Sequence, residues 1–160
     1  MSNSASLSKE FILESFLPYR LSLLSNTVSR GVSTAYRKAH GLSVTEWRVV
    51  AVLGRFPGLT ASEVAQRTAM DKVAISRAVK RLQQRRLVTR SPHREDRRRL
   101  PLRLTPGAGV GLFKAVVPKA LACEARLLAA LDEREKAALD RLLVKLQAAA
   151  EALLRSRICS

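Results

Sequence analysis

The sequence predicts a mainly α-helical protein with one small β-hairpin. Along most of its 160 residues, apolar side chains recur every three or four positions, which is the spacing of one helix face. Over residues 87–105 the period shortens to two, so LVTRS predicts one strand and LPLRLT a second. In the second strand Leu100, Leu102 and Leu104 share one face and Arg103 lies on the other. A chain of this length can bury a core as one domain, alone or with an appended helical part.

The charge of the chain is strongly unbalanced. It has 29 lysines and arginines against 13 aspartates and glutamates, a net charge of +16 and a pI near 11.3. A field of this sign attracts polyanions and adds self-repulsion to the folded state. Nucleic acid is therefore the first candidate partner, ahead of a membrane surface or an acidic protein.

Several classes of protein receive no support from the sequence. It has no apolar run of about 18 residues that could span a membrane, and MSNSASLSKEF lacks the basic and apolar regions of a secretory signal. Cys123 and Cys159 form neither a disulfide framework nor a metal spacing, and His40 and His93 are far apart. There is no phosphate-binding loop, nucleophile elbow or catalytic triad. We therefore expect a cytoplasmic protein that is not an enzyme and has no cofactor, metal or membrane partner.

The first long helix is expected to run from Pro18 to about His40. Proline is tolerated in the first turn of a helix, and Gly41 provides a C-terminal stop. A second helix follows, capped by either Ser43 or Thr45, and FPGLT ends it. Its apolar residues are Trp47, Val49, Val50, Val52 and Leu53.

A short helix, a tight turn and a longer helix come next. Thr60, with Glu63 three residues later, has capping-box spacing and starts a helix over residues 61–68. After a turn at residues 69–71, KVAISRAVKRLQQRRL forms the longer helix, and this order is typical of a helix-turn-helix. Its apolar face is Ile75, Val79 and Leu82, with Ala74, Ala78 and Val73 beside them. Its opposite face carries Lys72, Ser76, Arg77, Lys80, Arg81 and Gln84.

Two further helices are expected after the hairpin. Thr105 and Pro106 fit the cap and first position of a helix that runs to about Ala130, although glycines at 107, 109 and 111 weaken its first turns. The last helix begins near Asp132 and has a broad apolar stripe, which is typical of a helix that packs against a partner. The stripe consists of Leu139, Leu142, Leu146, Ala149 and Leu153, widened by Leu143, Ala150 and Leu154.

Positive charge is concentrated in the helix-turn-helix and the hairpin. Residues 62–105 hold 13 lysines and arginines against four acids, so they carry +9 of the net +16. A helix fits the major groove of DNA, about 12 Å wide, and arginines of a hairpin beside it suit the narrow minor groove. Asp96 at the hairpin tip has two explanations: it holds Arg98 in a bidentate pair, or it is a chance surface acid.

These residues resemble the MarR family of winged helix-turn-helix transcription regulators. The family's wing signature, Asp-x-Arg, five residues and Leu-Thr, stands here as Asp96 and Arg98, followed by Leu104 and Thr105. The family's helix-turn-helix is similar to SEVAQRTAMDKVAISRAVKRLQQRRLV. Its first two helices are similar to FLPYRLSLLSN and LSVTEWRVVAVL. The resemblance covers residues 16–154, with one departure in the three glycines after Thr105.

The resemblance implies a winged helix-turn-helix homodimer on a pseudo-palindromic operator in double-stranded DNA. It divides the chain into an N-terminal arm and first dimerisation helix (1–40), a DNA-binding lobe (41–105) and C-terminal dimerisation helices (106–160). Arg98 would be the minor-groove arginine and Asp96 its holder. The expected DNA-binding residues are Ser62, Thr68, Lys72, Ser76, Arg77, Lys80, Arg81, Arg94, Asp96, Arg97, Arg98 and Arg99.

The resemblance also implies a repressor of a catabolic or efflux operon, released by a small aromatic carboxylate or its thioester. An arginine can pair with a carboxylate while Trp47 offers a ring face, but core packing of Trp47 and a helix-bridging role for Arg20 remain open. The alternative function is a non-specific or architectural nucleic-acid-binding protein without a ligand switch. The expected ligand-binding residues are Tyr19, Arg20, Ser22, Asn26, His40, Trp47 and Arg48.

Overall fold

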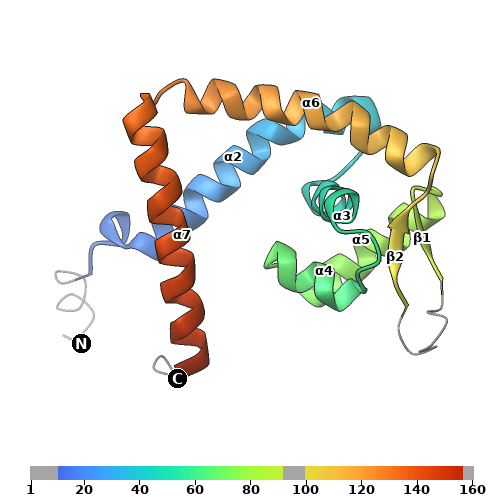
Figure 1. The fold of residues 1–160 in the computed structure, drawn as a ribbon, viewed down its shortest axis with the longest axis horizontal. Coiled ribbons are helices and arrows are strands. Elements are labelled where there is room, and N and C mark those ends of the chain that lie inside the picture. Colours follow the sequence, from blue (N-terminus) through green and yellow to red (C-terminus); the bar gives the residue numbers. More distant parts are fainter. Residues whose placement is uncertain (1–10, 92–99, 157–160) are drawn as a thin grey trace, which may run out of the picture. The chain divides into compact units, whose positions relative to one another are not determined.

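The computed structural model describes residues 11–91 and 100–156 and divides the chain into two compact units, Met1–Leu121 and Ala122–Ser160. Figure 1 labels the helices and strands. The end of α6 and all of α7 belong to the second unit, and the start of α6 and the other elements belong to the first. The predicted mainly α-helical fold with one β-hairpin is confirmed. The elements are η1 (Leu13–Ser15), α2 (Leu17–His40), α3 (Val44–Arg55), α4 (Ala61–Thr68), α5 (Lys72–Gln84), β1 (Val88–Arg90), β2 (Leu102–Leu104), α6 (Ala108–Leu128) and α7 (Glu133–Ser156).

Reciprocal side-chain caps fix where α3 and α4 begin. Ser43 Oγ accepts from the Glu46 N–H at 3.2 Å, and Glu46 Oε2 accepts from the Ser43 N–H at 2.7 Å. Thr60 and Glu63 form the same capping box at the start of α4, as the sequence predicts. Of the two predicted caps of α3, Ser43 is therefore correct and Thr45 is wrong.

The turn between α4 and α5 is tight and contains no glycine. Ala69 ends α4 in the left-handed region, with φ 50. Asp71 then caps α5, because its Oδ1 accepts from the N–H groups of Val73 at 2.9 Å and Ala74 at 3.0 Å. The backbone of the first turn of α5 is thus fixed by one carboxylate.

The hairpin is an antiparallel pair, with Val88 opposite Leu104. On its other side Leu102 bridges to Leu59, in the loop before α4. Leu102 is fully buried and Leu104 half-buried, but Leu100, which was predicted to share their face, is exposed. The prediction for Leu100 is wrong because the ladder begins only at Leu102, so the alternation of faces does not reach back to it.

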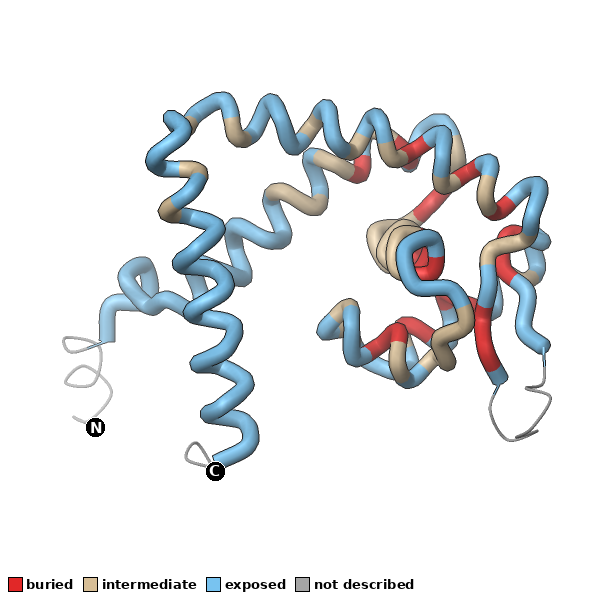
Figure 2. Tube along the Cα trace, viewed as in Figure 1, coloured by how far each residue is buried: buried red, intermediate tan, exposed pale blue. Residues whose placement is uncertain are grey.

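One hydrophobic core holds the first unit together. It joins α3, α4, α5 and the hairpin to the C-terminal end of α2 and the first part of α6 (Figure 2). The lobe predicted over residues 41–105 therefore shares its core with residues on both sides of it. The largest fully buried side chains are Tyr36, Leu42, Val49, Val50, Leu53, Val64, Ile75, Val79, Leu82, Leu102 and Val116.

The start of α6 depends on Thr105 and one of the three glycines. Thr105 Oγ1 accepts from the Gly109 N–H at 2.9 Å, as expected of a cap. Pro106 lies in a turn and the helix begins at Ala108, so Pro106 is not the first helical residue. A Cβ at Gly109 would lie 2.1 Å from the carbonyl oxygen of Leu87, and this close approach therefore requires glycine.

Apolar side chains remain exposed in both units. Asp132 caps α7 as predicted, its Oδ1 accepting from the Glu135 N–H at 2.8 Å, and no residue of this helix is buried. In the first unit, the N-terminal part of α2 exposes Leu17, Leu21 and Leu24. Within residues 11–91 and 100–156, no helix has the length and apolar character needed to cross a membrane.

Candidate nucleic-acid interface

One side of α5 is polar and faces solvent. Three of the four residues that make up this outward face are cations, and none of the three has a hydrogen-bond or ion-pair partner in the part of the chain that the structure describes. Their donors are therefore available to an anionic partner. The outward face of α5 consists of Lys72, Ser76, Arg77 and Lys80, all exposed. The opposite side, Ile75, Ala78, Val79 and Leu82, is buried in the core.

The two residues of α4 in the predicted DNA-binding set have different surroundings. Ser62 is exposed and lines a shallow depression of about 350 Å³ with Ala69 and Lys72. A second shallow depression, of about 320 Å³, runs along α5 and shares Lys72 with the first. Thr68 is half-buried, and its hydroxyl donates to the carbonyl of Val64 at 2.8 Å, within its own helix.

Arg81 differs from Lys72, Arg77 and Lys80, the other described cations of the predicted DNA-binding set, because it is bonded to a side chain of the protein itself. Its Nε donates to Oε1 of Glu46 at 2.9 Å. Glu46 is 5% exposed and also accepts from the Ser43 N–H. One buried carboxylate therefore connects the start of α3 to the last turn of α5.

The environment of the Glu46 carboxyl favours its charged form. Burial raises its pKa, but the hydrogen bonds from Ser43 and Arg81 outweigh burial and hold the pKa below its ordinary value. The ion pair is present at neutral pH and fixes the orientation of α5 on α3.

Arg85 anchors the C-terminal end of α5. The helix ends short of the predicted Leu87 because Arg86 takes a left-handed conformation, with φ 57. Arg85 Nη2 donates to the carbonyl of His40 at 2.6 Å and Nη1 to the carbonyl of Gly41 at 3.3 Å. Gly41 ends α2 with φ 60, so Arg85 satisfies carbonyls at the end of that helix.

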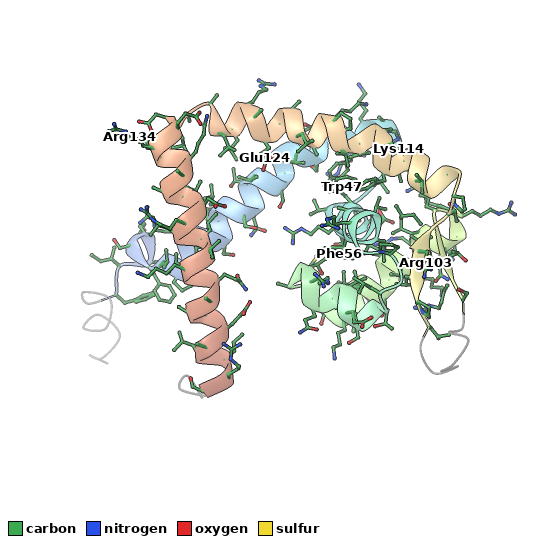
Figure 3. All side chains as sticks on the ribbon, viewed as in Figure 1. Trp47, Phe56, Arg103, Lys114, Glu124 and Arg134 are labelled. Atoms are coloured by element: carbon green, nitrogen blue, oxygen red, sulfur yellow. The ribbon has the colours of Figure 1, made fainter. Side chains whose placement is uncertain are left out.

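The described part of the hairpin adds further exposed cations beside α5. Arg90 lies on β1 and is exposed. Arg103 lies on β2 (Figure 3) and is also exposed. A Cβ at Gly58 would lie 3.3 Å from Nη2 of Arg103, so this guanidinium stands over the loop that precedes α4. The predicted tip residues lie outside the described residues, and the pairing of Asp96 with Arg98 stays a prediction. These residues are Arg94, Asp96, Arg97, Arg98 and Arg99.

The predicted ligand-binding residues are spread along α2 and the start of α3. Tyr19, Arg20 and Ser22 lie exposed in the first turns of α2, Asn26 is exposed further along it, and His40 is its last residue. With a helical rise of 1.5 Å per residue, Tyr19 and His40 are about 30 Å apart. The structure of one protomer therefore does not bring all of these side chains to one point.

Two of the predicted ligand-binding residues have partners on α2. The rings of Trp47 and Tyr36 are 5.5 Å apart, and Trp47 is half-buried at the edge of the core (Figure 3). Arg48 Nη2 donates to Ser29 Oγ at 3.0 Å. His40 has a different feature, since its Nε2 is buried and has no hydrogen-bond partner among the described residues.

Comparison with known proteins shows which family the chain belongs to. A sequence model described as the MarR family matches residues 40–99. The HTH-type transcriptional repressor MdtR of Bacillus subtilis (strain 168) is 32% identical over 111 residues, which cover 69% of this chain and 71% of the relative. The chain belongs to the MarR family. It is thus a transcriptional regulator, and its family is one of regulators and not of enzymes.

Solved structures of MarR proteins confirm the winged helix-turn-helix fold. A MarR/EmrR family transcriptional regulator from Acinetobacter sp. ADP1 is 29% identical with a TM-score of 0.80, and the match covers 89% of this chain and 99% of that chain. The MarR family protein Rv2887 of Mycobacterium tuberculosis, solved in complex with p-aminosalicylic acid, is 27% identical with a TM-score of 0.67. That match covers 83% of this chain and 99% of Rv2887.

Sequence reasoning missed several residues that position α5 in this MarR protein. Asp71 had a readable signal, because an aspartate directly before a helix is a common cap. The bond between Glu46 and Arg81 had none, since the two are 35 residues apart. The bonds from Arg85 to the end of α2 were equally beyond any local pattern.

We expect the ion pair between Glu46 and Arg81 to stabilise this MarR protein less in acid than at neutral pH. Glu46→Gln should lower the free energy of unfolding by about 1–2 kcal/mol at pH 7, the size of one hydrogen-bonded charge pair that is half exposed. The pKa of Glu46 is lowered in the folded state. Its contribution to the free energy of unfolding is therefore complete above the ordinary carboxyl pKa, and it is lost as the pH falls through the folded-state pKa. Urea titrations of both proteins between pH 7 and pH 3, at one protomer concentration, should show the difference shrinking in acid. A difference that grows in acid would contradict the assignment.

Proposed function

We propose that this MarR-family regulator is a repressor that binds a pseudo-palindromic operator as a homodimer and releases it on binding a small aromatic acid. The outward face of α5 carries the proposal. Lys72, Arg77 and Lys80 have no partner among the described residues, while the other side of the helix is locked into the core. A helix fixed in this way can enter the major groove with its donors ready. Repression is supported by the Bacillus relative, which is named a repressor.

The homodimer is supported by the exposed apolar residues of α2 and α7. The apolar stripe of α7, which we call its seam, is exposed along its length, and α2 exposes Leu17, Leu21 and Leu24. Apolar surfaces of this extent mark interaction sites, and two-fold symmetry would place the two α5 helices about 34 Å apart in successive major grooves. In this proposal residues 1–40 and 106–160 carry the dimer and residues 41–105 bind DNA.

The aromatic acid is supported by a relative and by one buried atom. Rv2887 was solved with p-aminosalicylic acid. In this chain His40 Nε2 is buried without a partner among the described residues, which is unfavourable until another group bonds to it. Tyr19, Arg20 and Ser22 lie far from His40 along α2. In this proposal they contact the same ligand as His40 only if they come from the second protomer of the dimer.

A competition titration tests specific DNA binding. The full-length protein is bound to a fluorescent duplex obtained by selection from random DNA, and unlabelled unrelated duplex is added at about 150 mM salt. A specific repressor should be displaced by the unrelated duplex only at about 1000-fold higher concentration than by the selected one. A ratio near one would instead support the alternative, a non-specific or architectural nucleic-acid-binding protein.

The ligand is tested separately on the same complex. Aromatic acids and their thioesters, starting with p-aminosalicylate, are screened for a rise in melting temperature, and those that bind are added to the complex with the selected duplex. Release of the duplex by a stabilising compound supports the switch. If DNA binding is specific but no such compound affects it, the protein is still a DNA-binding regulator, and aromatic acids are rejected as its effectors.

A further inference from the structure

One apolar side chain stands on the polar side of α5. Val73, which the sequence places beside the core face, is 55% exposed, so that prediction is wrong. It lies two residues before Ile75, which is about 200° around the helix, and Ile75 is fully buried. Val73 instead lines the depression along α5 together with Ser76, Arg77 and Lys80.

Neither folding nor helix formation accounts for a valine at this position. Its side chain makes no contribution to the buried core, and β-branched residues form helices less readily than alanine, lysine or arginine. Every other exposed position of α5 is polar. The residue is therefore best explained by what the outward face binds.

The local structure holds Val73 rigidly. Its N–H donates to Asp71 Oδ1 at 2.9 Å, which fixes the backbone of the first turn. A β-branched side chain in a helix has essentially one rotamer, so the direction of its methyl groups is fixed as well. Ser76 and Arg77, three and four residues on, lie on the same side of the helix and supply hydrogen-bond donors around it.

This combination matches the chemistry of one base. In the major groove thymine differs from cytosine in presenting a C5-methyl group, which apolar side chains contact, while the other base edges present hydrogen-bonding atoms. Residues near the N-terminus of a recognition helix are those that reach base edges. We propose that Val73 is a specificity-determining residue that reads one thymine in each operator half-site through its C5-methyl group. The inference rests on the proposed function, in which α5 enters the major groove.

The test removes the methyl group from each side of the contact in turn. Duplexes selected by the full-length protein are resynthesised with each thymine replaced by deoxyuridine, which lacks only the C5-methyl, and affinities are measured by fluorescence anisotropy at fixed salt. For the wild-type protein, one thymine per half-site should be sensitive, with a loss of about fourfold for each methyl no longer buried. For Val73→Ala, which withdraws two methyl groups from the contact, replacing that same thymine should have a clearly smaller effect. Val73→Thr, which keeps one methyl at nearly the same shape, should retain part of the sensitivity.

Folding does not confuse the outcome, because alanine is a better helix former than valine and Val73 is exposed; the melting temperature should stay unchanged or rise. A selected operator whose deoxyuridine sensitivity is the same in wild-type and Val73→Ala would overturn the role of Val73 and leave the proposed function standing. If selection yields no preferred duplex, the proposed function fails, and the inference fails with it.

Discussion

Leu146→Asp is expected to convert the proposed homodimer to monomers and to weaken operator binding by about 100-fold or more. Leu146 lies in the middle of the exposed seam of α7 and is 42% exposed in the protomer. An aspartate there would have to bury its charge against the partner's apolar helix, which is strongly unfavourable. Two half-sites held by one dimer gain affinity through effective concentration, and separate monomers lose that gain. Sedimentation velocity and fluorescence anisotropy on the same samples measure the two effects.

Val144→Asp is the matched control for this change. Val144 is 65% exposed and, two residues away, lies about 200° around α7 from Leu146. Val144→Asp introduces the same charge on the same helix, but on the side away from the seam. It should therefore leave both the dimer and operator binding unchanged. A dimer that survives Leu146→Asp, or one that dissociates equally with Val144→Asp, would refute the assignment of the seam as the interface.

Local patterns were sufficient to locate the main helices, although not all of their ends, because caps and periodicity act over three or four residues. The capping box of Thr60 and Glu63 and the cap at Asp132 both stand where the sequence places them. Leu100 shows the limit of this reasoning. Alternation continues through it, but pairing of β2 begins only at Leu102, and where a ladder begins depends on a strand distant in sequence.

The site was harder to predict, because periodicity identifies the face of a helix and not the partner of each side chain. Val73 is apolar, yet its angular position places it outside the core. Arg81 has the same residue type and nearly the same face as Arg77, and only the three-dimensional structure brings Glu46 to it from 35 residues away. The resemblance to a family therefore predicted the class of surface, and packing decided which of its residues remain available to bind.

Arg77→Ala and Arg81→Ala are accordingly expected to fail in different ways. Arg77 is exposed and has no partner among the described residues. If α5 enters the major groove as proposed, the loss of Arg77 removes two groove contacts per dimer, so operator binding should weaken by about 30-fold or more. The salt dependence should also decrease if Arg77 neutralises phosphate. The melting temperature of Arg77→Ala should equal that of the wild type.

Arg81→Ala removes the partner of a buried carboxylate, so it should lower the free energy of unfolding by about 1–2 kcal/mol.

A double-mutant cycle separates the two roles, since residues that act through one bond are not additive. Glu46→Gln should add little destabilisation to Arg81→Ala, whereas it should add its full effect to Arg77→Ala. Operator affinity is compared well below the melting temperature of each variant, so that loss of fold does not count as loss of contact. If Arg81→Ala proves as stable as the wild type and binds DNA as weakly as Arg77→Ala, then Arg81 contacts DNA directly and its bond to Glu46 does not position α5. If instead only Arg77→Ala weakens DNA binding, the groove contact belongs to Arg77, the arginine that has no partner among the described residues.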